Sequence, residues 1–307
     1  MLVIVAYLLV ILIWSTTPLA LQASQEGIGF FMAAMLRMTV SAMLSLPLVW
    51  IMGQRLERSR QAINSYVGGT IGIYGAMMAV YWGAHYIPSG LISVLYGLSP
   101  MLSGAIAWVW LKERELTPAR VFALLVALAG LGLVVAARLD LDEQSWRGIV
   151  GTLVSVFCFA LSAVWVKRSN AGLHPMVQTS GSLLLSSVLY VLSIPFFGLV
   201  WPDPWPTRGL LSLGYLTVFG SLLGFVLYFL VLRHYSAARV TMITLIAPVL
   251  AVLWGHLLND ETLQLATLQG AGLLLLALAL YQWPQRLDRL LHHGLLAPQR
   301  WRARKKA

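Results

Sequence analysis

The sequence predicts an all-α membrane protein with ten transmembrane helices, arranged as two inverted five-helix repeats around a central cavity. Three observations lead to this prediction. The chain is 59% apolar and only 10% charged, whereas a soluble domain carries about 25% charged residues. Its apolar residues form runs of roughly 20, the length that a helix needs to cross the bilayer core. Finally, a pattern in the first half of the chain recurs in the second half.

The apolar runs give the spans in chain order. We expect helices rather than a β-barrel, because a helix satisfies its own backbone hydrogen bonds in lipid and no alternating segments of about 10 residues occur. The first run has neither a basic segment before it nor a clear cleavage site after it, so we interpret it as a span and not as a signal peptide. The ten spans are residues 3–21, 30–52, 64–83, 88–110, 118–138, 147–167, 175–200, 209–232, 238–258 and 263–284.

The distribution of basic residues predicts the topology. With the N-terminus on the cytoplasmic side, 17 Lys and Arg residues fall inside and 3 outside, and Arg37 lies within a span. Cytoplasmic loops collect Lys and Arg, so we expect a plasma-membrane protein (in a bacterium, the inner membrane) with both termini in the cytoplasm. The tail, residues 285–307, ends in "QRWRARKKA". We expect this tail to contact anionic lipid headgroups and not nucleic acid.

The recurring pattern indicates an inverted repeat. The stretch "YGLSPMLSGAIAWVWLKE" begins at Tyr96, and "TLIAPVLAVLWGHLLNDE" begins 148 positions later at Thr244. Each has a proline at its fifth position and a glutamate at its eighteenth. Five spans per repeat is an odd number, so the second copy runs upside down, which is a plan of secondary transporters. We therefore divide the chain into repeats at 1–140 and 141–284, followed by the basic tail.

These segments, together with "IWSTTPLALQ" in the first span and "LRMTVSAMLSLP" in the second, resemble the EamA type of the drug/metabolite transporter superfamily. The resemblance covers residues 3–284. It implies a plasma-membrane carrier whose two five-helix halves surround a central cavity. Many members of this superfamily export metabolites or amino acids.

The two prolines point to the solute site. A proline cannot donate to the carbonyl four residues before it, so Pro100 frees the Tyr96 carbonyl and Pro248 frees that of Thr244. Helical spacing places further hydroxyls on the same faces. We expect the solute to contact Ser93, Tyr96, Thr241 and Thr244, and both prolines to act as hinges. The alternative is that the Ser and Thr hydroxyls only bond back to their own helices.

Aromatic residues extend the predicted site. Tyr74 and Tyr81 lie in the third span at the depth of the prolines, and Trp14 and Trp165 are further candidates. The alternative for such residues is packing or an interfacial belt.

Arg37 is the only formal charge well inside a span. A charge at this depth faces the protein interior and indicates function. Its planar guanidinium suits a solute carboxylate. The competing interpretation is that it braces the outer helix ends near Glu261.

Missing residue types narrow the function. No Asp or Glu lies within a span, which argues against exchange of cations for protons, and no Lys lies deep enough to bind a doubly charged phosphate. We expect no metal or cofactor, because no Cys/His cluster or nucleotide-binding loop is present. The sequence predicts a secondary transporter, not an enzyme, for a neutral or zwitterionic amphipathic solute such as an amino acid, with export as the expected direction. A membrane-embedded enzyme or lipid-related protein is the alternative, but no catalytic group converges. The oligomeric state is not predicted.

Overall fold

The regular structure is helical throughout the described part of the chain. The computed structural model describes residues 2–87, 89–113, 117–136, 143–247, 250 and 265–282. Pro248, Glu261 and the tail at 285–307 lie outside these residues. The first half contains α1 (Leu2–Gln25), α2 (Phe30–Ile51), α3 (Arg60–Thr70), η1 (Ile71–Gly75), α4 (Ala76–Gly83), α5 (Ser89–Tyr96), α6 (Ser99–Leu111) and α7 (Pro118–Ala136). The second half contains α8 (Ser145–Ser169), α9 (Pro175–Phe197), α10 (Thr207–Tyr215), η2 (Leu216–Leu223), α11 (Gly224–His234), α12 (Ala237–Thr241) and α14 (Leu265–Gln282).

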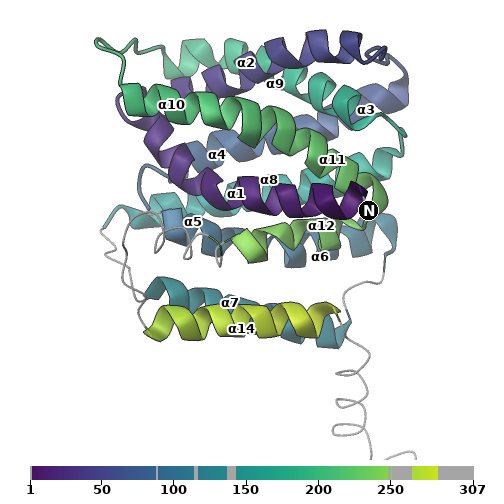
Figure 1. Cartoon of the computed structure of the whole chain (residues 1–307), viewed down its shortest axis with the longest axis vertical. Coiled ribbons are helices and arrows are strands. Elements are labelled where there is room, and N and C mark those ends of the chain that lie inside the picture. The colour runs from purple at the N-terminus through teal and green to yellow at the C-terminus, as the bar shows by residue number, and fades with distance from the viewer. Residues whose placement is uncertain are drawn as a thin grey trace, which may run out of the picture.

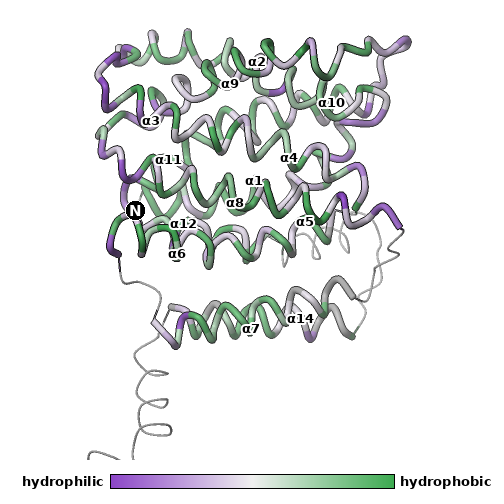
Figure 2. The backbone as a smooth tube through the Cα atoms, turned by 180° about the vertical axis from the view of Figure 1, so that it is seen from behind, coloured by the Kyte–Doolittle hydropathy of each residue, from purple (hydrophilic) through white to green (hydrophobic). Residues whose placement is uncertain are grey.

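The helices form an apolar belt between two polar ends. Figure 2 shows hydrophobic residues along the helices and hydrophilic residues in the loops at both ends. Within the described residues, five helices are long and apolar enough to cross a membrane: Leu2–Gln25, Phe30–Ile51, Ser145–Ser169, Pro175–Phe197 and Thr207–His234. Large apolar side chains also face outward, for example Trp50 at 80% exposed and Phe196 at 84% exposed. Lipid is the solvent in which such a surface is stable.

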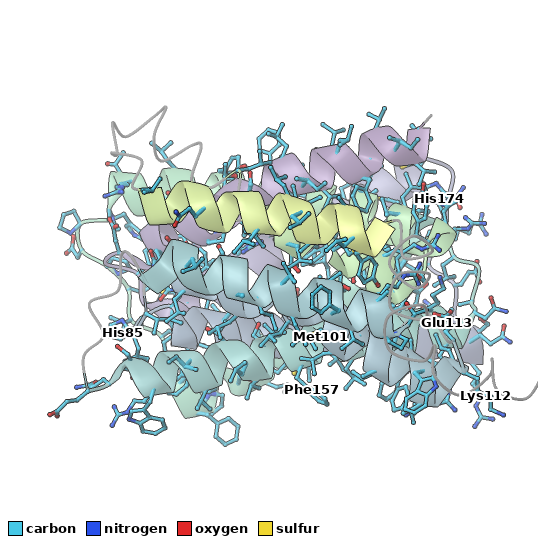
Figure 3. All side chains as sticks on the ribbon, turned by 90° about the horizontal axis from the view of Figure 1, so that it is seen from below. His85, Met101, Lys112, Glu113, Phe157 and His174 are labelled. Atoms are coloured by element: carbon cyan, nitrogen blue, oxygen red, sulfur yellow. The ribbon has the colours of Figure 1, made fainter. Side chains whose placement is uncertain are left out.

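The helix axes run side by side, so the loops gather at two ends of the bundle. Lys112, Glu113 and His174 lie at one end and His85 lies at the other (Figure 3). The N-terminus lies at the same end as Lys112 and His174 (Figures 1 and 3). We call this the N-terminal end and the other the opposite end.

Helix packing has the same pattern in both halves. The first helix of the chain, α1, packs on α10 and α11, and the first helix of the second half, α8, packs on α3 and α4. Likewise α2 packs on α9, α6 on α12 and α7 on α14. The α7–α14 pair forms one edge of the bundle (Figure 1). Each of these contacts joins a helix of the first half to a helix of the second.

Glycines bring the paired helices close together. A methyl group added at Gly72 in η1 would lie 2.6 Å from Ser162 Oγ, and one added at Gly224 in α11 would lie 2.8 Å from Trp14 Nε1. Such spacing lets the backbones of membrane helices approach closely. Both η1 and η2 are π-helical, and π-turns inside α-helices often occur at functional sites.

One predicted span is not a single helix, which corrects the sequence interpretation. Residues 88–110 were expected to form one helix with Pro100 in its middle. Instead α5 ends at Tyr96, a turn occupies Gly97 and Leu98, and α6 begins at Ser99. Pro100 therefore lies in the first turn of α6, and Leu98 between the two helices keeps right-handed helical backbone angles (φ −74°, ψ −16°). The proline lies at a break between two helices that follow one another closely along the chain.

Candidate functional site

A central cavity lies among helices from both halves. Its walls come from α1, α2, α4 and α5 of the first half, and from α8, η2, α11 and residues 243–247 of the second. Its volume, measured as the space open to the centre of a water molecule, is about 90 Å³. One water needs roughly 10–15 Å³ on this measure, so the cavity can hold several waters or a small solute.

The cavity is displaced toward the opposite end of the bundle. Along α1 it is lined by Trp14, Thr17, Pro18 and Leu21, which lie beyond the middle of that helix. Three aromatic rings close it toward the N-terminal end, and we call them the aromatic floor: Trp14, Phe159 and Tyr228. Their centroids are 5.7 Å apart for Trp14–Phe159, 5.2 Å for Trp14–Tyr228 and 5.4 Å for Phe159–Tyr228.

Contacts beneath the floor close the bundle further. The Tyr7 hydroxyl donates to the Arg239 carbonyl at 3.1 Å, and Lys167 donates to the carbonyl of Tyr235. The Ser103 and Thr241 hydroxyls are bonded at 2.8 Å. The Tyr7 and Ser103 bonds each join the first half to α12 of the second half, below the cavity. The Lys167 bond lies within the second half.

Arg37 reaches the cavity wall from α2. Its side chain is only 1% exposed. Nε donates to Ser221 Oγ at 2.7 Å, and Nη1 donates to the Tyr81 hydroxyl over a longer 3.4 Å. Within the described part of the chain no carboxylate pairs with this guanidinium. The group thus braces α2 against η2 and α4, and Nη2 lies beside Gly220.

The carbonyl that Pro100 leaves without a backbone donor is satisfied across the two halves. The Thr244 hydroxyl donates to the Tyr96 carbonyl at 2.8 Å, and both residues line the cavity. These are the first residues of the two recurring stretches, 148 positions apart. Thr244 also donates to the Thr241 carbonyl at 2.7 Å, so bonding to its own helix and lining the cavity occur together.

The predicted site residues separate into two groups. Trp14, Arg37, Ser93, Tyr96 and Thr244 line the cavity.

The other four predicted residues do not line it. Tyr81 contacts Arg37 from behind, and Thr241 lies against Ser103 beneath the floor. The Tyr74 hydroxyl bonds to Ser193 of α9 at 2.6 Å. Trp165 donates to the Asn64 side chain at 3.1 Å.

Two aromatic lining residues, Phe159 and Phe225, were not among the predicted site residues. Phe225 could have been found from the repeat, since it lies 148 positions after Met77 and both residues line the cavity. For Phe159 we find no such signal, because an aromatic residue in an apolar span looks the same whether it faces lipid, protein or a cavity.

The described residues contain no group of three or more His, Cys, Asp or Glu side chains that could hold a metal. None of the described residues that line the cavity is a carboxylate. The chemistry that these residues offer is a guanidinium, several hydroxyls and aromatic faces.

Apolar helices that enclose a small cavity between two packed halves define the class: a multi-pass membrane protein with the architecture of a transporter. The chain belongs to the EamA-like transporter family, whose profile matches residues 1–136 and 146–282.

Similar proteins agree with this class. The chain is 27% identical to the "Uncharacterized transporter YvbV" of Bacillus subtilis, over 64% of each protein. It is 24% identical to the "Uncharacterized inner membrane transporter YedA" of Escherichia coli, covering 88% of this chain and 87% of that one. It is 23% identical to the "Probable terminal-alkyne amino-acid exporter" of Streptantibioticus cattleyicolor, covering 87% and 89%. A solved crystal structure covers 92% of this chain and 98% of its own with a TM-score of 0.76 at 20% identity, which shows a shared fold.

Proposed function

We propose that this protein is a secondary transporter, not an enzyme, which moves a small zwitterionic metabolite such as an amino acid by alternating access. The proposed membrane is the plasma membrane, or the inner membrane of a bacterium, with both termini in the cytoplasm and export as the direction. The observation that carries the proposal is Arg37, a buried guanidinium at the wall of an aromatic cavity with no carboxylate partner among the described residues. A buried cation without a partner is costly, so a solute carboxylate would stabilise it.

Recurring contacts support two inverted repeats at 1–140 and 141–284. Gly72 packs on Ser162, and at the positions 148 away from these two, Trp14 Nε1 donates to the Gly220 carbonyl at 3.3 Å. The Tyr96–Thr244 bond joins two positions with the same separation. The π-helical segments also correspond, since residues 71–75 shifted by 148 fall within Leu216–Leu223. Inverted repeats let the two halves exchange conformations, which is how alternating access works in such carriers.

The cavity walls support an amphipathic solute. Trp14, Tyr96, Phe159 and Phe225 present large apolar faces, whereas the polar groups gather around Arg37, Thr17 and Thr244. A molecule with a carboxylate at one end and a small apolar part would contact both. The name of the Streptantibioticus relative, an amino-acid exporter, agrees with this class of solute.

Exchange in proteoliposomes tests the proposal. Purified protein is reconstituted with a pool of amino acids inside, and the loss of each from the lumen is followed by mass spectrometry. We expect one or a few solutes to exit faster than from empty vesicles. Arg37→Gln should reduce that rate at least tenfold, because a hydrogen bond to a charged group contributes about 1.5–3 kcal/mol.

Arg208→Gln is the matched control. Arg208 is a basic residue at the surface, 77% exposed, and pairs with Glu26 at 3.5 Å. The Arg208→Gln substitution should leave the rate of solute exit unaltered. Methyl esters of the transported solutes should not compete, since they lack the carboxylate. Exchange of no solute in the pool, or equal rates for Arg37→Gln and the parent, would contradict the proposal.

A further inference from the structure

Two adjacent residues of the π-helical segment η2, Gly220 and Ser221, contact both a charged and an aromatic group of the cavity. The Gly220 carbonyl accepts a hydrogen bond from Trp14 Nε1 at 3.3 Å, and Ser221 Oγ accepts one from Arg37 Nε at 2.7 Å. We call these two residues the η2 pair. Since Trp14 and Arg37 both line the cavity, the η2 pair fixes an indole ring and a guanidinium relative to each other.

The Ser221 hydroxyl is oriented as an acceptor toward Arg37. Its Oγ donates to Met38 Sδ at 3.8 Å, and a serine hydroxyl has only one hydrogen, so its lone pairs remain for the Nε–H of Arg37. The side chains of Ser221 and Arg37 are 0% and 1% exposed. The other bond of the guanidinium, from Nη1 to the Tyr81 hydroxyl, is longer at 3.4 Å. Ser221 therefore makes the shorter of the two bonds that orient the guanidinium.

Gly220 keeps space free beside the same guanidinium. A methyl group added at Gly220 would lie 3.1 Å from Arg37 Nη2 and 3.2 Å from Leu216 Cδ2. Both distances are shorter than a favourable contact of about 3.5–4.0 Å, so Arg37 would have to move. A methyl group added at Gly214 in α10 would meet no atom within 4 Å. The close approach to Arg37 is thus specific to position 220.

We propose that the η2 pair positions the Arg37 guanidinium for the solute carboxylate: Ser221 sets its direction and Gly220 leaves the space that it needs. The inference rests on the proposed transport function, because it requires that Arg37 binds the carboxylate. Ser221 is not among the described residues that line the cavity, so it acts through Arg37. A binding group must be held within about 0.5 Å of its productive geometry by the residues around it, and the η2 pair provides that support from the second half of the chain.

Nuclear magnetic resonance tests the positioning contact without a solute. The full chain is labelled with ¹⁵N-arginine and studied in detergent, and the Arg37 Nε signal is identified as the one lost in Arg37→Gln. Ser221→Ala should shift this signal and speed the exchange of its proton with water, because the Nε–H loses its acceptor. Gly220→Ala should shift the signal as well. An Arg37 Nε signal that is the same in Ser221→Ala and the parent would overturn the proposal.

Ser41→Ala is the matched control for Ser221→Ala. Ser41 is also 0% exposed and also joins α2 to η2, since its Oγ donates to the Thr217 carbonyl at 3.0 Å and to the Arg37 carbonyl at 2.7 Å. It contacts the backbone of Arg37 and not the guanidinium. Both substitutions remove a buried hydroxyl between the same two segments, so a purely structural role would give both the same effect.

Transport kinetics test the consequence for binding. The pool of amino acids is loaded into proteoliposomes at several concentrations, which gives KM and the maximum rate for each amino acid that exits. Ser221→Ala and Gly220→Ala should raise KM about tenfold, since a hydrogen bond to a charged group contributes about that factor in affinity. The maximum rate should change less than about twofold, the pattern expected when only binding is lost. Ser41→Ala and Gly214→Ala should keep the parent KM.

A combined variant separates positioning from an independent effect. In the Arg37→Gln background, Ser221→Ala should not raise KM further, because the group that it positions is absent. A further rise would refute the positioning role. Equal KM values for Ser221→Ala and Ser41→Ala, with exit still dependent on Arg37, would refute the positioning role alone. If the parent releases no amino acid from the pool, the proposed function fails and the positioning role falls with it.

Discussion

The Tyr96 carbonyl provides a quantitative test of how the two halves are joined. Its backbone donor would be residue 100, which is a proline, and the Thr244 hydroxyl donates to it at 2.8 Å. Thr244→Val keeps the shape of the side chain and removes this donor. A buried acceptor left unpaired costs about 1–3 kcal/mol. The same hydroxyl lies 2.7 Å from the Thr241 carbonyl, so its one hydrogen is shared and we expect a cost of about 1–2 kcal/mol.

A second substitution should rescue the first. Pro100→Ala restores a backbone N–H that can donate to the same Tyr96 carbonyl. In this background Thr244→Val should cost less than about 1 kcal/mol, which gives a coupling energy of about 1 kcal/mol between the two positions. The sign of the coupling follows from the geometry: each donor is needed only when the other is absent.

The assay is a double-mutant cycle on the folded protein in mixed micelles. The parent, the two single variants and the double variant are unfolded by titration with sodium dodecyl sulfate, and helix content is followed by circular dichroism. Thr179→Val is the control, because the Thr179 hydroxyl is equally buried but has no hydrogen-bond partner. We expect that control not to destabilise the protein, because replacing an unpaired buried hydroxyl with a methyl group removes no hydrogen bond. Costs that add within about 0.3–0.5 kcal/mol in the double variant would refute the assignment of Thr244 as the donor to Tyr96.

Three further predictions concern packing, topology and motion. Gly72→Ala should destabilise the fold by about 1–3 kcal/mol, because its methyl group would lie 2.6 Å from Ser162 Oγ. Adding Ser162→Gly should restore stability, and a failure to do so would contradict the packing argument. Arg58→Cys should react with an impermeant thiol reagent in inside-out vesicles and not in intact cells, and the reverse result would invert the topology. Pro100→Ala should slow solute turnover more than it weakens binding and should change how fast Ser93→Cys is labelled from each side; parent rates in both assays would show that Pro100 is no hinge.

Much of the fold follows from the lengths of the apolar runs. The second span was predicted at 30–52 and α2 covers Phe30–Ile51, because lipid sets the length of an apolar helix and polar residues end it. The break at Gly97 was not predicted. A proline in an apolar run fits both a kinked helix and a new helix start, and the sequence alone does not distinguish them.

The candidate site was predictable only where its chemistry differs from its surroundings. Arg37 is distinct in an apolar span, and the structure places it at the cavity wall. Tyr74 met the same criteria of depth and aromatic character as Tyr81, yet it bonds to Ser193 and faces α9. Which way a tyrosine faces depends on the rotation of its helix, and the π-helical segment Ile71–Gly75, which contains Tyr74 and precedes Tyr81, changes that rotation. The spacing of residues in the sequence does not reveal such a turn.

The two halves share backbone features but differ in their cavity side chains, and these two properties have different consequences for transport. Positions 148 apart share backbone features: the π-helical segments, the close glycines at 72 and 220, and the contact between Tyr96 and Thr244. At the cavity their side chains diverge, since Arg37 corresponds to Leu185 and Trp14 to Ser162. A matched backbone allows each half to adopt the other's conformation at little cost in free energy, which alternating access requires. A zwitterion has two different ends, and a site with identical halves could not bind them differently. For the zwitterionic solute proposed above, we therefore expect the carboxylate to bind where the two halves differ, and the difference that supplies a positive charge is Arg37.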